Sequence, residues 1–398
     1  MRHYEIKKTS MPKINPEIEA FARIKVVGVG GSGGNAINHM INCKVKGVEF
    51  IAMNTDAQDL HHSLAPKKIH IGKNVTRGNG AGMDPSIGRK AAEETLEEIQ
   101  AVLKGADMVF IAGGMGGGTG TGAAPIIAKV AKEQGSLTVG VVTKPFMFEG
   151  AQRGRLAQEG LDELSKEVDA LILVQNDRLA GVIEKNTTLA AAFALCDDVL
   201  RQAVEGISDL ITTQGIINLD FADIRAVMQN AGSALMGIGS AVGDNRAIEA
   251  ARMAINSPLL DLSIEGAKGV LFAIAGGDDM TMFEIQEAAK VITESIDKDA
   301  KVIFGAIKDE KLKKNELKVT VIASGFPNQN YHKNLPIVGQ NNSVSKSQPQ
   351  QKEEKPSFMS RMTKAPTPAV EPEPEPVAEE PEQEDWSSVP AFLRRNKK

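Results

Sequence analysis

Two glycine-rich segments, each lying between an apolar strand pattern and a helical pattern, restrict the fold of this chain more than any other feature. They span Gly28–Ala36 and Ala112–Gly122. Glycines allow backbone N–H groups to approach phosphate oxygens closely, and the amino-terminus of the following helix adds a partial positive charge. Each segment therefore predicts a loop that holds phosphate groups.

The first segment alone leaves several interpretations open. Gly28, Gly30 and Gly33 match the G-x-G-x-x-G pattern of dinucleotide-binding proteins. The same glycines would also suit another nucleotide or a tight structural turn, and the acid that the pattern expects near the end of the second strand falls late, at Asp56. The second segment favours a nucleoside triphosphate, because a dehydrogenase needs only one phosphate loop. Neither segment continues into the Gly-Lys-Ser/Thr of a Walker A motif.

Apolar runs alternate with helical patterns in the first half of the chain. The helical segments, such as Ser86–Lys104 and Ala151–Glu167, have a period near 3.6 residues. Continuous apolar strands that alternate with helices are typical of a doubly wound parallel sheet. The expected strands are Ile24–Val29, Val48–Met53, Lys68–Ile71, Met108–Ala112, Leu137–Val142 and Ala170–Val174.

A long helix and a second set of strands follow. An apolar stripe from Leu189 to Ile211 predicts a helix of about 24 residues, roughly 35 Å long, that could pass down the middle of the body. After it we expect a smaller α/β domain with helices at Arg246–Ile255 and Met282–Ser295. Its strands are expected at Ser233–Val242, Val270–Ala275, Val302–Ile307 and Leu317–Ala323.

Composition narrows the function classes. The net charge of −5 argues against a generally basic nucleic-acid binder. No apolar run approaches the roughly 18 residues of a membrane span, and the first residues do not read as a secretory signal, so we expect a cytoplasmic protein. Cys43 and Cys196 lie in apolar helical patterns and are expected to be buried, inert thiols.

The end of the chain differs from the rest. Of 38 glycines, 37 precede Pro327, whereas 11 of 18 prolines lie from Pro327 onward. Residues 327–385 have too few apolar side chains to offset chain entropy, which predicts a disordered linker. Beyond it, Trp386–Lys398 combines apolar residues with four basic ones, which suits either a frayed terminus or a peptide that binds a partner.

Several motifs together resemble the FtsZ family, the bacterial tubulin-like cell-division GTPases. The most specific is GGGTGTG at Gly116–Gly122, a signature shared with tubulin. The resemblance is closer to FtsZ, because the chain is short and ends in a peptide containing PAFLRR. The other matching segments are GVGGSGGNA at 28–36, AMNTDAQDL at 52–60, TKPFMFEG at 143–150 and NLDFADI at 218–224.

The resemblance implies a tubulin-like α/β fold that binds GTP or GDP with Mg²⁺. It has a Rossmann-type parallel-sheet GTPase domain, a long central helix, a second smaller α/β domain and a disordered C-terminal tail. The expected boundaries are 1–21 for an N-terminal tail, 22–187 for the GTP-binding domain, 188–213 for the central helix, 214–326 for the C-terminal α/β domain, 327–385 for the linker and 386–398 for the partner-binding peptide.

Candidate nucleotide contacts come from both loops and from two side-chain pairs. Phe193 and Asp197 share one helix face, where a ring can stack on a purine and a carboxylate can accept hydrogen bonds from guanine. Core packing for Phe193 and a solvated or capping acid at Asp197 are the alternatives. The loop candidates are Gly31, Ser32, Gly33, Gly34 and Asn35 in the first loop, and Gly116, Gly117, Gly118, Thr119, Gly120 and Thr121 in the second.

Glu149 and Arg153 are also four residues apart, near a helix start. On residue chemistry alone they make a surface ion pair; the resemblance implies instead that Glu149 bonds the ribose and Arg153 reaches the guanine or phosphate side. The segment Gly72–Gly82 reads in the family as a loop that senses the γ-phosphate, and otherwise as a mobile loop.

The catalytic candidates are Asn218, Asp220 and Asp223. Two acids three residues apart can hold and polarise a water, although Asp223 alone would suit a helix amino-terminus equally well. The resemblance implies that this loop meets the nucleotide of the next subunit. The sequence does not single out Mg²⁺ ligands, and phosphates with water could hold the ion.

The resemblance implies a polymerising GTPase that forms the cell-division ring. It would assemble head to tail as a homopolymer, bind membrane-tethering division proteins through Trp386–Lys398 and lie at midcell on the inner face of the membrane. It is not expected to bind nucleic acid. The alternative from the residues is a NAD-dependent Rossmann oxidoreductase, against which no catalytic histidine arrangement is apparent among the six histidines. A catalytically silent paralogue is less consistent with Asp220 and Asp223.

Overall fold

The computed structural model describes residues 22–181, 187–213, 215–217, 219–257, 264–309 and 312–326. The predicted N-terminal tail, linker and terminal peptide lie outside the described residues, as does Asn218.

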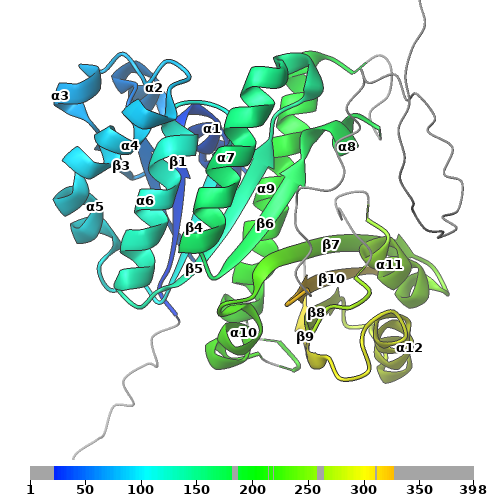
Figure 1. Ribbon diagram of the computed structural model, residues 1–398. Coiled ribbons are helices and arrows are strands. Elements are labelled where there is room, and N and C mark those ends of the chain that lie inside the picture. The colour runs from blue at the N-terminus through cyan, green and yellow to red at the C-terminus, as the bar shows by residue number, and fades with distance from the viewer. Residues whose placement is uncertain are drawn as a thin grey trace, which may run out of the picture. The chain divides into compact units, whose positions relative to one another are not determined.

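The described strands form a ten-stranded sheet in the order β3-β2-β1-β4-β5-β6-β7-β10-β8-β9 (Figure 1). Neighbouring strands from β3 to β7 are parallel, which confirms the predicted parallel sheet. The first six strands are β1 (Ile24–Val29), β2 (Val48–Asn54), β3 (Lys67–His70), β4 (Met108–Gly114), β5 (Leu137–Lys144) and β6 (Ala170–Gln175).

The remaining strands continue the same sheet. Strand β10 pairs antiparallel with both β7 and β8, and β8 pairs parallel with β9. A ladder from Ala170↔Gly232 to Ile172↔Ala234 joins β6 to β7, so the sheet continues from the predicted GTP-binding domain into the predicted C-terminal domain. The strands are β7 (Gly232–Val242), β8 (Gly269–Gly276), β9 (Lys301–Lys308) and β10 (Glu316–Ser324).

Helices cover both faces of the parallel part, because alternate strand residues point to opposite sides. Val26 packs in the core with α1 (Gly30–Asn42) and α9 (Leu189–Thr212). Val27 belongs to the opposite core with α4, α5, α6 and α7. Their bounds are α4 (Pro85–Glu94), α5 (Leu96–Leu103), α6 (Thr119–Glu133) and α7 (Ala151–Glu167).

Several predicted elements match and a few differ. Helices α7 and α9 have the expected extents. The pattern at 86–104 predicts one helix, but the structure has two, α4 and α5, separated at Thr95. The Thr95 hydroxyl donates to the Ala91 carbonyl and accepts the Gly72 N–H, which ties the break to the neighbouring loop. Cys196 is buried as expected, whereas Cys43 lies past the end of α1 and is exposed, so that prediction is wrong for Cys43.

The short helices complete the described structure. The 3₁₀ helix η1 (Met147–Glu149) precedes α7. The others are α2 (Ala57–His62), α3 (Lys73–Thr76), α8 (Asn176–Ala180), α10 (Phe221–Met228), α11 (Arg246–Ile255) and α12 (Met282–Thr293).

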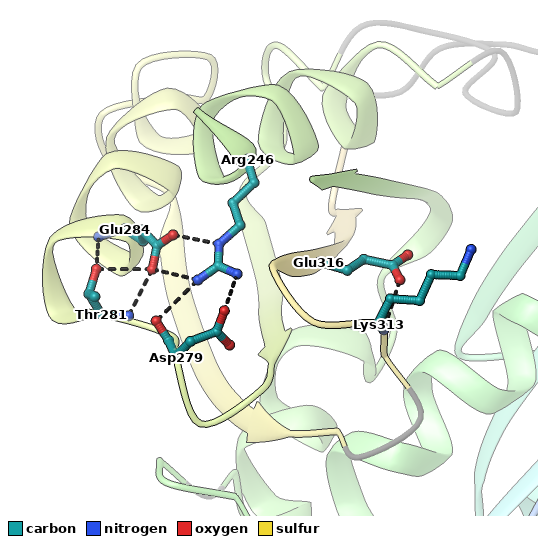
Figure 2. A network of polar contacts seen from close by, with 6 residues as sticks. All are labelled: Arg246, Asp279, Thr281, Glu284, Lys313 and Glu316. Carbon is teal, nitrogen blue, oxygen red and sulfur yellow. Dashed lines mark hydrogen bonds and ion pairs between the residues drawn. The ribbon is translucent and has the colours of Figure 1, made fainter. Parts of the chain in front are cut away.

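A buried arginine links α11 to α12 and to the loop before α12. Arg246 at the start of α11 donates to Glu284 on α12 and to Asp279 in the β8–α12 loop, at 2.6 and 2.7 Å (Figure 2). Glu284 also completes a capping box with Thr281. Because its side chain is 6% exposed, Arg246 is stable there only with both charges paired.

Candidate nucleotide-binding site

The two glycine-rich loops lie side by side at the carboxyl edge of the parallel sheet. Strands β1 and β4 are neighbours, with Gly28 opposite Ala112, and each leads directly toward a helix amino-terminus. A Cβ on Gly33 would lie 2.5 Å from the Ala112 carbonyl oxygen, and one on Gly120 would lie 2.7 Å from that of Gly114. Backbone packed this closely leaves room for glycine only, so the two loops form one rigid unit.

Other glycines of the loops face open space. A Cβ on Gly34 or Gly117 would meet no atom within 4 Å, and one on Gly31 would meet only the Asp59 carboxylate, at 3.4 Å. Ser32 lies over the second loop, since its Oγ would be 2.8 Å from a Cβ on Gly114. Gly31, Ser32 and Asn35 are exposed. The edge therefore has open positions next to two helix amino-termini, which is the arrangement that binds phosphate.

The loop threonines bond inside the protein. The Thr119 and Thr55 hydroxyl oxygens are 2.6 Å apart, and the Thr121 hydroxyl accepts the Gly116 N–H at 2.8 Å. Both Thr119 and Thr121 are buried. Gly116 itself has φ +100°, a value that glycine adopts readily. The two hydroxyls therefore stabilise the conformation of the loop, and the groups of the loop that could bind a ligand are its backbone N–H groups.

The loop at 72–82 is ordered by hydrogen bonds to the end of β2. It contains α3, and the Thr76 hydroxyl and the Gly80 N–H both donate to the Thr55 carbonyl, at 3.2 and 3.3 Å. Its far end reaches the second glycine-rich loop, because a Cβ on Gly118 would lie 2.8 Å from that of Ala81. Thr55 therefore joins three loops. Sequence reasoning did not single it out, although it lies within the AMNTDAQDL motif.

Glu149 and Arg153 lie beside the second loop. Arg153 donates to Glu149 at 2.6 Å, and the other Glu149 oxygen accepts the Phe146 N–H at 2.9 Å. A Cβ on Gly116 would lie 2.7 Å from the Arg153 carbonyl oxygen. The ion pair considered from the sequence is thus present, and it lies at the loop where the family resemblance places the nucleotide.

Phe193 and Asp197 lie on the first half of α9. The Phe193 ring is 39% exposed and meets Phe146 edge to face at 5.6 Å, so it is not an enclosed core residue. Burial raises the pKa of Asp197 to about 6, and His39 acts in the opposite direction. Among the described residues we find no hydrogen-bond partner for this carboxylate. A half-buried acid without a partner is suited to accept hydrogen bonds from a ligand.

The candidate catalytic acids lie at the other edge of the sheet. Asp220 caps α10, accepting the Asp223 N–H at 2.7 Å. Arg225 on the same helix donates to the Gly135 carbonyl, in the turn that precedes β5. Strand β5 begins at this edge, whereas the glycine-rich loops follow the carboxyl ends of β1 and β4 (Figure 1). The structure therefore does not bring Asp220 and Asp223 to the loops of the same chain.

The described part of the chain contains neither a cluster of metal ligands nor a membrane-spanning helix. No three His, Cys, Asp or Glu side chains converge there as they would around a metal ion. No helix in it is both long and apolar enough to span a membrane.

Comparison with known proteins places this geometry in a family. Residues 23–184 match the model of the Tubulin/FtsZ family GTPase domain, and residues 232–327 match that of the FtsZ family C-terminal domain. An empty FtsZ dimer from M. jannaschii is 46% identical with a TM-score of 0.73, and the match covers 77% of this chain and 89% of that one. The chain belongs to the FtsZ family.

Membership of the FtsZ family makes this chain a GTPase and excludes the Rossmann oxidoreductase. More distant structures share the fold. CetZ2 from Haloferax volcanii, solved as a GTPγS-bound protofilament, is 22% identical with a TM-score of 0.66, over 76% of this chain and 92% of that one. A GDP-bound monomer of CetZ1 from the same organism is also 22% identical, with a TM-score of 0.68, over 77% and 95%.

Proposed function

We propose that this GTPase polymerises head to tail, with GTP held between subunits and hydrolysed with the help of acids from the next subunit. The observation that carries this is the separation of the two halves of the site. The glycine-rich loops lie at one edge of the parallel sheet, and Asp220 and Asp223 lie at the other. Helix α9, with 24 residues, spans about 36 Å between them. Stacked subunits would bring the two edges together.

Each group at the carboxyl edge has a proposed role toward GTP. Backbone N–H groups of both loops bind the phosphates, and the loop at 72–82 meets the γ-phosphate. Phe193 stacks on the purine, and Asp197 accepts hydrogen bonds from guanine N1–H and N2–H, which adenine cannot donate together. Glu149 bonds the ribose, and Arg153 reaches the guanine or phosphate side. The open glycines and the unpartnered carboxylate support these roles.

Mg²⁺ fits this site as an ion held chiefly by phosphate oxygens and water. The described residues offer no cluster of acids for it, and Mg²⁺ commonly binds proteins in that way. Bound there, the ion would neutralise charge on the phosphates. Asp220 and Asp223 of the next subunit would orient the attacking water and accept its proton; Asn218, outside the described residues, is proposed as a third member of this set on its sequence motif.

The filament would form the division ring at midcell, on the inner face of the membrane. The M. jannaschii FtsZ structure is a dimer and the CetZ2 structure is a protofilament, which supports self-assembly in proteins of this fold. We propose that Trp386–Lys398 docks into a groove on membrane-tethering division proteins.

The test is whether GTP hydrolysis per molecule rises with protein concentration. A shared site predicts a steep rise, and a constant value from dilute to concentrated protein would refute the proposal. Asp220→Asn keeps the helix cap and removes the charge, so it should bind GTP, assemble and hydrolyse slowly. Mixed with Asp197→Ala, which retains the acids but binds GTP weakly, it should recover part of the activity. No recovery at any ratio would mean that the acids do not act between subunits.

A further inference from the structure

Two adjacent acids on α9 have very different surroundings. Asp198 Oδ1 accepts from His39 Nε2 at 3.1 Å and from Arg201 Nε at 2.7 Å, and its Oδ2 accepts from Gln202 Nε2 at 2.7 Å. Burial alone would raise the pKa of Asp198, but these hydrogen bonds outweigh it and lower the pKa to about 2. Asp197, one residue earlier, makes no such bond within the described chain.

His39 connects two parts of the nucleotide site. It lies on α1, the helix that starts in the first glycine-rich loop, whereas Arg201 and Gln202 lie on α9 with Asp198 itself. Because Asp198 is ionised, it only accepts, and His39 Nε2 must donate. The bond therefore ties the phosphate-side helix to the helix that carries Asp197.

We propose that His39 is a positioning residue for guanine recognition, which docks α1 on Asp198 and thereby sets where Asp197 lies relative to the phosphate loops. This inference rests on the proposed role of Asp197. Without the bond, α1 and α9 would still pack through apolar contacts such as those of Ile37 and Leu200, but no polar contact would fix their register at this point.

The charged and titratable groups around the His39 imidazole are few. On α9, Asp198 bonds it, Arg201 bonds the same Asp198 oxygen and Asp197 interacts with it electrostatically. The Cys43 thiol, one residue past the end of α1, lies 3.8 Å from Nε2. His39 opposes the effect of burial on the Asp197 pKa. Removing the imidazole should therefore raise that pKa and move the loss of GTP binding in acid to a higher pH.

The test compares GTP with inosine triphosphate, which has the same phosphates and lacks the guanine 2-amino group. Binding is measured on the full chain without nucleotide, for the unaltered protein, His39→Leu and His39→Gln. Gln202→Leu is the matched control, because it removes a bond to the same acid from within α9. We expect His39→Leu to lower the GTP-to-inosine-triphosphate affinity ratio by roughly tenfold. His39→Gln, whose amide can donate to Asp198, should restore most of it, and Gln202→Leu should keep it.

The pH profile supplies the second readout. The midpoint for GTP binding should move upward in His39→Leu and stay in place in Gln202→Leu. An unchanged affinity ratio together with an unchanged midpoint in a folded His39→Leu protein would overturn the inference. If the unaltered protein itself does not distinguish the two nucleotides, and Asp197→Ala binds GTP normally, the proposed role of Asp197 has failed instead.

Discussion

Replacing Asp197 by asparagine should stabilise the nucleotide-free protein while weakening its affinity for GTP. Burial raises the pKa of Asp197 from 3.8 to about 6, which means that folding disfavours the charged form. Two pKa units correspond to about 3 kcal/mol. Because the side chain is only partly buried, solvent screening reduces this to about 1–2 kcal/mol. Asparagine has a similar helix propensity and no charge, so the variant should gain that amount.

The pH dependence identifies the cause of the gain. An acid whose pKa is raised by folding destabilises the protein fully at a pH above its pKa in the folded state. The destabilisation decreases between the folded-state and unfolded-state pKa values, and it is absent below the unfolded-state pKa. The gain of Asp197→Asn should therefore be complete at pH 8, shrink below pH 6 and vanish near pH 4. Thermal unfolding without nucleotide would measure it, as a rise of a few degrees at pH 8.

A control with the opposite sign is next to it in the chain. The pKa of Asp198 is lowered to about 2, so its contribution to stability is present above the unfolded value near 3.8 and is lost as the pH falls through 2. Asp198→Asn should therefore lower the unfolding temperature at pH 8. Equal unfolding temperatures for Asp197→Asn and the unaltered protein at pH 8 would refute the reasoning, and a gain that persists at pH 4 would assign it to packing.

Three further changes test other parts of the structure. Gly33→Ala should lower the free energy of unfolding by about 1–3 kcal/mol and weaken GTP binding, because its Cβ would press on backbone atoms on both sides. Gly34→Ala is the control and should keep the stability, because its Cβ would enter open space; equal unfolding temperatures for the two variants would contradict this prediction. Arg246→Met should lower the stability measured by denaturant unfolding, because Glu284 and Asp279 lose their ion-pair partner, and it should leave the GTP affinity unchanged; an unchanged unfolding midpoint would show that the ion pairs do not stabilise the fold. Deleting 386–398 should leave hydrolysis and assembly intact and abolish recruitment to the membrane in cells, a proposal that normal recruitment of the shortened chain would disprove.

Local pattern was enough to predict the elements of this fold. The continuous apolar strands, the glycine turns after them and the stripe from Leu189 to Ile211 each depend on residues close together in the chain. A strand buried on both faces of a parallel sheet needs a continuous apolar run, and a helix packed on one side needs an apolar stripe with a period near 3.6 residues. The break at Thr95 was not predictable in the same way, because the Gly72 N–H that bonds there comes from another loop.

Motifs in the sequence also indicated which residues gather at the nucleotide, since family signatures are contiguous. Only the tertiary structure decided how these residues stand toward one another. Among the described residues it gives Asp197 no hydrogen-bond partner and Asp198 three, although the two are neighbours in sequence with the same chemistry. It also placed Asp220 at the edge of the sheet opposite the glycine-rich loops. The physical reason is that the partners of a side chain come from other elements, here α1 at His39 and the turn at Gly135. How those elements pack determines whether an acid is buried, which groups it bonds and which edge of the sheet it lies at.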